Sequence, residues 1–232
     1  MAFEMKLFRH HQALAHISST RVFHRRAILI LACVLSRFVS GCGKENSNAD
    51  IAPVFQSVEN SEAASPAITV FDLAGQRVDP FDDANARAFV FIFLATECPI
   101  SNRYAPEIRR LAEKFARSGV KFWLVYADPD LTPDAITKHL KEYQLPPAAL
   151  RDPQHSLVRV SQVRVTPEAA VFLPDQRLVY HGRIDDLYVE LGKNRPEATR
   201  HDLESVLQTV LQGKPVPYAT TRAIGCYIPD AK

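Results

Sequence analysis

Cys98 is the residue whose setting in this sequence most strongly suggests chemistry. It follows the apolar stretch Ala88 to Leu94 and precedes a predicted helix, within the segment FLATECPIS of residues 93–101. A thiol at the start of a helix lies near unpaired backbone N–H groups and the positive end of the helix dipole. Both favour the thiolate, which is the form that attacks a disulfide or a peroxide. We therefore expect Cys98 to have a lowered pKa and to act as a nucleophile; the alternative is a buried structural cysteine.

The elements around Cys98 alternate between strands and helices. The continuous apolar run before Cys98 predicts a strand buried on both faces, and the spacing of apolar residues after it predicts a helix that ends at Gly119. The last two predicted strands share a tight turn, so they should be antiparallel and the sheet mixed. We expect an α/β fold with a central mixed β-sheet flanked by helices and an N-terminal β-hairpin extension. The predicted strands are 68–73, 77–78, 88–94, 120–126, 169–173 and 177–180, and the predicted helices are 101–118, 132–143, 156–160 and 199–211.

The Cys98 segment together with Val165-Thr166-Pro167-Glu168 resembles the thioredoxin-like redoxin family, especially its extracytoplasmic thiol–disulfide oxidoreductases. The resemblance covers about residues 66–212. It extends to the AhpC-TSA-like superfamily, to which the redoxin family is related. It implies a thioredoxin-like fold in which Cys98 is the attacking cysteine. It also implies that Pro167, in the cis form, places the backbone of Thr166 beside the sulfur to pair with an incoming peptide strand. No cofactor is expected, because electrons pass through the thiols.

Ser101 is where this chain departs from the Cys-x-x-Cys turn of the family. A serine hydroxyl can hydrogen-bond a thiolate, but it cannot attack a mixed disulfide to release the substrate. A resolving thiol must therefore come from elsewhere. Cys226, in the segment AIGCYI of residues 223–228, is a candidate, either as a disulfide partner or as the resolving cysteine. A free tail thiol, an intermolecular disulfide and a metal ligand remain open for Cys226.

Three other functions compete with a thiol–disulfide oxidoreductase. A peroxiredoxin-type peroxide reductase has a related fold, but its motif places Pro and Thr where this chain has Phe91 and Ala95. Copper binding could use the two cysteines and histidines, although none of these residues forms a close ligand motif. A non-catalytic interaction module, with Ser101 marking lost redox function, is the third. The histidines considered are His139, His155, His181 and His201.

The first 41 residues resemble a bacterial lipoprotein signal peptide. Arg25 and Arg26 precede an apolar run that is too short to span a bilayer of ~30 Å, and the run ends in Val39-Ser40-Gly41-Cys42. Small residues before a cysteine resemble a lipobox, so Cys42 is expected to be lipidated. This would anchor the protein to the membrane on the extracytoplasmic, periplasmic face of the bacterial cell envelope, with envelope protein thiols and disulfides as partners.

Composition supports this domain organisation. The 232 residues are 47% hydrophobic and 23% charged with a net charge of +2, which excludes a disordered or collagen-like chain. Much of the basic excess lies in residues 1–41, so nothing in the remainder indicates a nucleic-acid partner. We expect a signal peptide over 1–41, a lipidated cysteine and flexible tether over 42–66, a redoxin domain over 67–212, and an irregular tail over 213–232 that carries Cys226.

Overall fold

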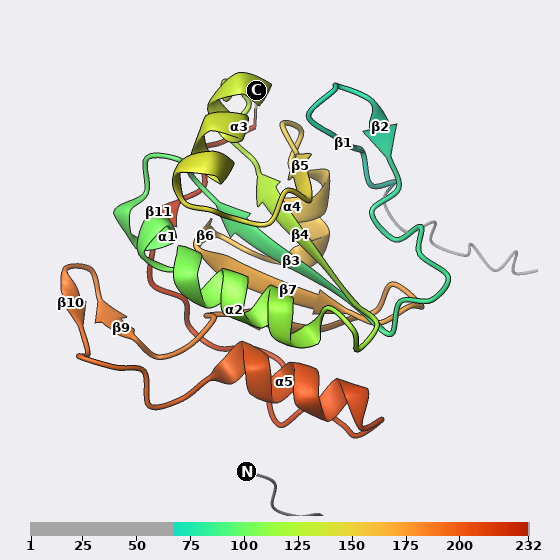
Figure 1. The fold of residues 1–232 in the computed structure, drawn as a ribbon, viewed down its shortest axis with the longest axis vertical. Coiled ribbons are helices and arrows are strands. Elements are labelled where there is room, and N and C mark those ends of the chain that lie inside the picture. Colours follow the sequence, from blue (N-terminus) through green and yellow to red (C-terminus); the bar gives the residue numbers. More distant parts are fainter. Residues whose placement is uncertain (1–66, 232) are drawn as a thin grey trace, which may run out of the picture. The chain divides into compact units, whose positions relative to one another are not determined.

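A seven-stranded mixed sheet forms the centre of the computed structural model, which describes residues 67–231 (Figure 1). The strand order is β2-β1-β5-β4-β3-β7-β8. Strands β3, β4 and β5 are parallel, whereas β7 is antiparallel to both β3 and β8. The strands are β1 (Val70–Phe71), β2 (Arg77–Val78), β3 (Ala88–Leu94), β4 (Val120–Tyr126), β5 (Ala149–Arg151), β7 (Glu168–Phe172) and β8 (Leu178–Gly182). The expected mixed sheet and the N-terminal β-hairpin of β1 and β2 are both confirmed.

Strand β3 is buried on both faces because helices and loops cover the sheet from both sides. Its even-numbered residues pack with apolar residues of α2 (Ala105–Phe115), α3 (Pro133–Glu142) and α5 (Asp202–Leu211). Its phenylalanines at 89, 91 and 93 pack on the opposite face with Leu157 of α4 (Ser156–Ser161). A strand enclosed in this way needs apolar residues at every position, which explains the run AFVFIFL.

The helix expected over residues 101–118 is instead two helices, α1 (Pro99–Arg103) and α2 (Ala105–Phe115). The break falls at Tyr104, two residues before Pro106. Proline has no backbone N–H, and its ring collides with the carbonyl four residues earlier, so one continuous helix cannot form through this position. The division leaves α1 as a single short helix that begins directly after Cys98.

The C-terminal part of the chain contains strands that the sequence did not predict. A small hairpin of β9 (Tyr188–Glu190) and β10 (Lys193–Asn194) precedes α5. The tail, which was expected to be irregular, contains strand β11 (Cys226–Tyr227), which pairs with β6 (Val165–Thr166). Figure 1 shows β11, in red, beside β6 and α1, and the C-terminal end of the tail beside α3.

The expected signal peptide, lipidated Cys42 and tether lie outside the described residues. Within residues 67–231, no helix has the length and apolar character needed to cross a membrane.

Candidate active site

Cys98 occupies the junction between β3 and α1 that the sequence predicted. It is the N-cap residue of α1, with Pro99 at the first helical position, and only 1% of its surface is exposed. As a thiol it donates a hydrogen bond to the carbonyl oxygen of Thr166, with a distance of 3.1 Å between the sulfur and the oxygen. The Thr166–Pro167 peptide bond is cis. The structure therefore brings together Cys98, Thr166 and Pro167, which are far apart in the sequence.

Cys226 joins the same cluster through the tail. In the antiparallel pairing of β11 with β6, Cys226 lies opposite Thr166, whose hydroxyl donates to the Cys226 carbonyl at 3.4 Å. The side chains of Cys98 and Cys226 are close enough to hydrogen-bond, and both thiols are free in this structure. The tail thus pairs with the backbone of Thr166, which the family resemblance predicts to pair with an incoming peptide strand.

Gly225 allows this close approach of the tail. A Cβ atom at this position would lie 2.1 Å from the Thr166 carbonyl oxygen and 2.6 Å from its carbonyl carbon. Real Cβ atoms essentially never come within 3.0 Å of another heavy atom in this way. Any side chain at residue 225 would therefore push Cys226 away from Cys98.

A second attachment holds the tail just before Gly225. The backbone of His181 in β8 donates to the Ala219 carbonyl at 3.0 Å and accepts from the Thr221 N–H at 3.2 Å. A Cβ on Gly182 would lie 2.3 Å from the Thr221 hydroxyl oxygen, so β8 also lacks a side chain where the tail crosses it. The tail is held on β8 by residues 219–221 and on β6 by β11, which contains Cys226.

The two thiols have opposite pKa shifts. Burial opposes ionisation of Cys98, but hydrogen bonds from the Cys226 thiol and from the backbone and hydroxyl of Ser101 outweigh it, so the pKa of Cys98 is lowered. Burial, together with the hydrogen bond and the negative charge of Cys98, raises the pKa of Cys226 to about 11. The lowered pKa agrees with the sequence-based expectation for Cys98. The pair therefore contains one thiolate-prone sulfur and one that keeps its proton.

Ser101 is buried one turn after Cys98 in α1. Its hydroxyl oxygen accepts from the Ala95 N–H at 3.5 Å. The Ser101 hydroxyl is also one of the groups that lower the pKa of Cys98. Both the backbone and the side chain of Ser101 thus favour the Cys98 thiolate. This placement matches the neighbour expected from the sequence.

Among residues 67–231, no group of three or more metal-ligating side chains includes Cys98 or Cys226. Three of the four histidines have other hydrogen-bond partners: His139 bonds Tyr126 and Asn102, His155 the Ala127 carbonyl, and His181 Glu168. The fourth, His201, lies in a separate group with Glu107 and Asp185.

Glu168 is a buried residue of the site for which the sequence analysis predicted no function. Its carboxylate accepts from the backbone N–H of Arg164 at 2.9 Å and of Val165 at 3.3 Å, so it holds the loop that carries Thr166. Its position directly after Pro167 could have indicated that it belongs to the site. Gly225 was also missed, although a glycine directly before a tail cysteine was visible in the sequence.

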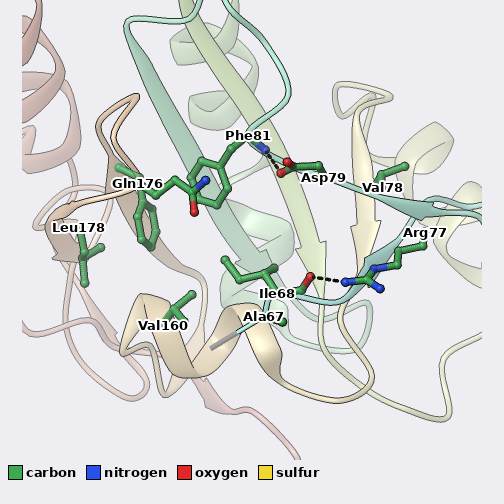
Figure 2. Close-up of a pocket in the computed structure, with 10 residues that line it drawn as sticks. Ala67, Ile68, Arg77, Val78, Asp79, Phe81, Val160, Gln176 and Leu178 are labelled. Atoms are coloured by element: carbon green, nitrogen blue, oxygen red, sulfur yellow. Dashed lines mark hydrogen bonds between the residues drawn. The ribbon is translucent and has the colours of Figure 1, made fainter. Parts of the chain in front are cut away.

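Two pockets differ in chemical character. One of about 200 Å³ is lined by both cysteines, Glu97, Asp128 and Tyr227 among others. A larger one of about 570 Å³ lies where the described chain begins, between Phe81, Val160 and Arg77 (Figure 2). The larger pocket has no cysteine in its lining and shares no residue with the first. Of these two pockets, only the smaller one could bring a substrate to a cysteine.

Comparisons with known proteins bear on the family and the fold. The model of the Redoxin family matches residues 59–207. A search of the curated proteins returned no significant match. Among solved structures, an uncharacterized conserved protein from Geobacillus kaustophilus is 26% identical, with a TM-score of 0.63 over 72% of this chain and 89% of that chain.

Two further solved structures are similar at lower identity. A hypothetical protein from Sinorhizobium meliloti is 24% identical, with a TM-score of 0.60 over 69% of this chain and 88% of that chain. A secreted disulfide oxidoreductase from Mycobacterium tuberculosis is 18% identical, with a TM-score of 0.42 over 62% of this chain and 94% of that chain. The family match spans more than half of the sequence and includes Cys98, Ser101 and the Thr166–Pro167 loop. The chain therefore belongs to the Redoxin family and has a thioredoxin-like fold.

Proposed function

We propose that this protein is a thiol–disulfide oxidoreductase in which Cys98 is the nucleophile and Cys226 the resolving cysteine. The observation that carries the proposal is that both cysteines meet at Thr166. The Cys98 thiol donates to the Thr166 carbonyl oxygen at 3.1 Å, and Cys226 lies opposite Thr166 in the pairing of β11 with β6. The pairing of β11 with β6 supports it further, because it keeps Cys226 beside Cys98 although the two residues are distant in sequence.

The reaction needs two exchange steps. The Cys98 thiolate attacks one sulfur of a substrate disulfide, forms a mixed disulfide and releases the first substrate thiolate. The Cys226 thiolate then attacks the Cys98 sulfur, forms the Cys98–Cys226 disulfide and releases the second substrate thiolate. Two electrons pass from the cysteine pair to the substrate, and the two protons lost by the pair reach the released thiolates directly or through water.

The order of attack follows from the opposite pKa shifts. While Cys98 is a thiolate, burial, the hydrogen bond and the charge of Cys98 together keep Cys226 protonated. Once Cys98 is part of a mixed disulfide, its charge is gone and only burial still opposes ionisation of Cys226. Cys226 therefore becomes a better nucleophile only after the first step, when a resolving thiol is needed.

The test compares wild type with Cys226→Ser by intact mass spectrometry. With a protein disulfide as substrate and no added thiol, wild type should end as an intramolecular disulfide, whereas Cys226→Ser should accumulate a mixed disulfide at Cys98. A variant that turns over like wild type would refute resolution by Cys226. Cys98→Ser is the control and should form no adduct.

Hydrogen peroxide tests the rival peroxidase activity in the same variant. A peroxide reductase would convert Cys98 to sulfenic acid, and without Cys226 that acid would over-oxidise. We expect no rapid peroxide turnover. The non-catalytic module predicts a thiol pKa for Cys98 at or above the ordinary value, which is opposite to the lowered pKa described above.

We also propose that the mature protein is lipidated at Cys42 and acts on protein thiols and disulfides of the bacterial cell envelope. The support is the sequence Val39-Ser40-Gly41-Cys42 after a short apolar run. Cys42→Ser should move the protein from the membrane fraction to the soluble fraction while the redoxin domain stays folded. Retention of that variant in the membrane fraction would contradict the lipid anchor.

A further inference from the structure

The two cysteines of the pair differ in their exposure to solvent. Cys98 is 1% exposed, because α1, the Thr166 loop and the tail enclose it. Cys226 is partly exposed on β11, and the residue after it, Tyr227, is 84% exposed. A thiol arriving from outside the molecule therefore meets Cys226 first.

The surface around Cys226 suits a protein partner. Tyr227 is one of only two large hydrophobic side chains that are strongly exposed among residues 67–231, and it lines the small pocket with Ile228 and Pro229. An exposed aromatic ring next to a reactive sulfur offers contact area at low conformational cost, as is typical of binding sites. The acidic residues Glu97 and Asp128 lie at the same pocket, so a partner with a neutral or basic surface is favoured over an acidic one.

We propose that the Cys98–Cys226 disulfide is opened by attack on the Cys226 sulfur, so that the mixed disulfide with an incoming protein dithiol forms on Cys226 and not on Cys98. This inference rests on the proposed function, because it needs the intramolecular disulfide. In a Cys-x-x-Cys turn both cysteines belong to one helix start, whereas here the two cysteines come from different elements and only Cys226 is partly exposed.

The exchange has two steps. The incoming thiolate bonds to the Cys226 sulfur, the Cys98–Cys226 bond breaks, and Cys98 leaves as a thiolate. The second thiol of the partner then attacks the partner's own sulfur in the mixed disulfide, which releases Cys226 and leaves the partner as a disulfide. Two electrons pass from the partner dithiol to the cysteine pair. The leaving-group preference agrees with this direction, because the thiol with the lower pKa leaves faster and Cys98 is that thiol.

The first experiment locates the mixed disulfide with glutathione as the probe. The oxidised full chain is mixed with glutathione, quenched within the first turnover by N-ethylmaleimide, digested and analysed by mass spectrometry. We expect glutathione on Cys226 and maleimide on Cys98. Glutathione on Cys98 with maleimide on Cys226 would overturn the inference and leave the proposed function intact. A chain that cannot be oxidised to the intramolecular disulfide would overturn the proposed function itself.

The second experiment uses the leaving group. Ser101→Ala removes a hydrogen bond to the Cys98 thiolate, so reduction of the disulfide by glutathione should slow by about two- to fivefold if Cys98 is the leaving group. If Cys98 were the attacked sulfur, Cys226 would leave and the rate would not fall. Ser205→Ala, at an exposed serine of α5, is the matched control and should reduce at the wild-type rate.

Discussion

Gly225→Ala tests whether the close approach of the tail is what places the resolving thiol. The new Cβ would lie 2.1 Å from the Thr166 carbonyl oxygen, about 0.9 Å inside the 3.0 Å limit for such contacts. Gly225 does not have a positive φ, so alanine is compatible with its backbone and the contact alone decides the effect. Because the opposing atoms belong to the backbone, they cannot rotate away, and β11 must move off β6.

The expected magnitude follows from the hydrogen bonds that hold β11. Ile228 donates to the Arg164 carbonyl at 3.1 Å, and Thr166 donates to the Cys226 carbonyl at 3.4 Å. At ~1 kcal/mol for each bond, losing both weakens tail docking by about 2 kcal/mol. Since 1.4 kcal/mol is a factor of ten, the equilibrium constant for tail docking should fall by about 30-fold. Because only the docked tail can resolve, the rate of resolution falls by up to the same factor.

Reaction with Ellman's reagent measures resolution directly. Attack by Cys98 releases one thionitrobenzoate, and attack by Cys226 on the resulting mixed disulfide releases a second. In wild type the second release should follow the first closely. In Gly225→Ala the first phase should persist and the second should slow by up to about 30-fold. Cys226→Ser defines the trace with no second release from within the molecule.

Gly192→Ala is the matched control for this substitution. Its Cβ would meet nothing within 4 Å, although its φ of +76° adds local strain, so any slowing caused by general destabilisation would appear there as well. If the second phase of Gly225→Ala has the wild-type rate, the tail reaches Cys98 without pairing on β6. That result would refute the claim that this pairing positions Cys226.

The remaining predictions concern ionisation and stability. Alkylation of Cys98 by iodoacetamide should reach half its maximum rate at a lower pH than an ordinary thiol requires, and Ser101→Ala and Cys226→Ala should each move that midpoint to higher pH. Because the folded-state pKa is lowered, ionisation of Cys98 stabilises the fold above the pKa of the unfolded thiol, and this contribution is lost as the pH falls through the folded pKa; unfolding by urea at several pH values measures it. Asp152→Ala should lower the free energy of unfolding by about 3 kcal/mol, because the fully buried carboxylate accepts hydrogen bonds from three backbone N–H groups at the start of α4. Urea denaturation checks this against Asp175→Ala, an exposed residue whose removal should change stability by less than about 0.5 kcal/mol.

The central strands could be predicted to the residue, because burial on both faces demands an unbroken apolar run. The bounds of β3 and β4 agree with the sequence analysis, and α3 begins at the predicted place, where Thr132 accepts from the Ala135 N–H. The break between α1 and α2 could have been predicted from Pro106, but the apolar spacing across it was continuous and outweighed that sign.

The position of Cys226 could not be predicted from local sequence. Strand β11 has two residues, and a pairing that short carries no periodic pattern. What places it is the fit of Gly225 against Thr166 and of Thr221 against Gly182, and these are contacts between segments that only the folded chain brings together. The place of Cys98 could be predicted because it is defined by one strand and one helix start that are neighbours in the sequence.

The pairing of β11 with β6 also makes the dithiol a property of the native state. In a Cys-x-x-Cys turn the two sulfurs stay near each other even when the protein unfolds, because only two residues separate the two cysteines in the chain. Here the α1 start, the Thr166 loop and the tail must all be in place before the two sulfurs meet. A trivalent arsenical, which needs two neighbouring thiols, should therefore bind the folded reduced protein and be released on unfolding, so that the cysteine pair reports the completion of folding.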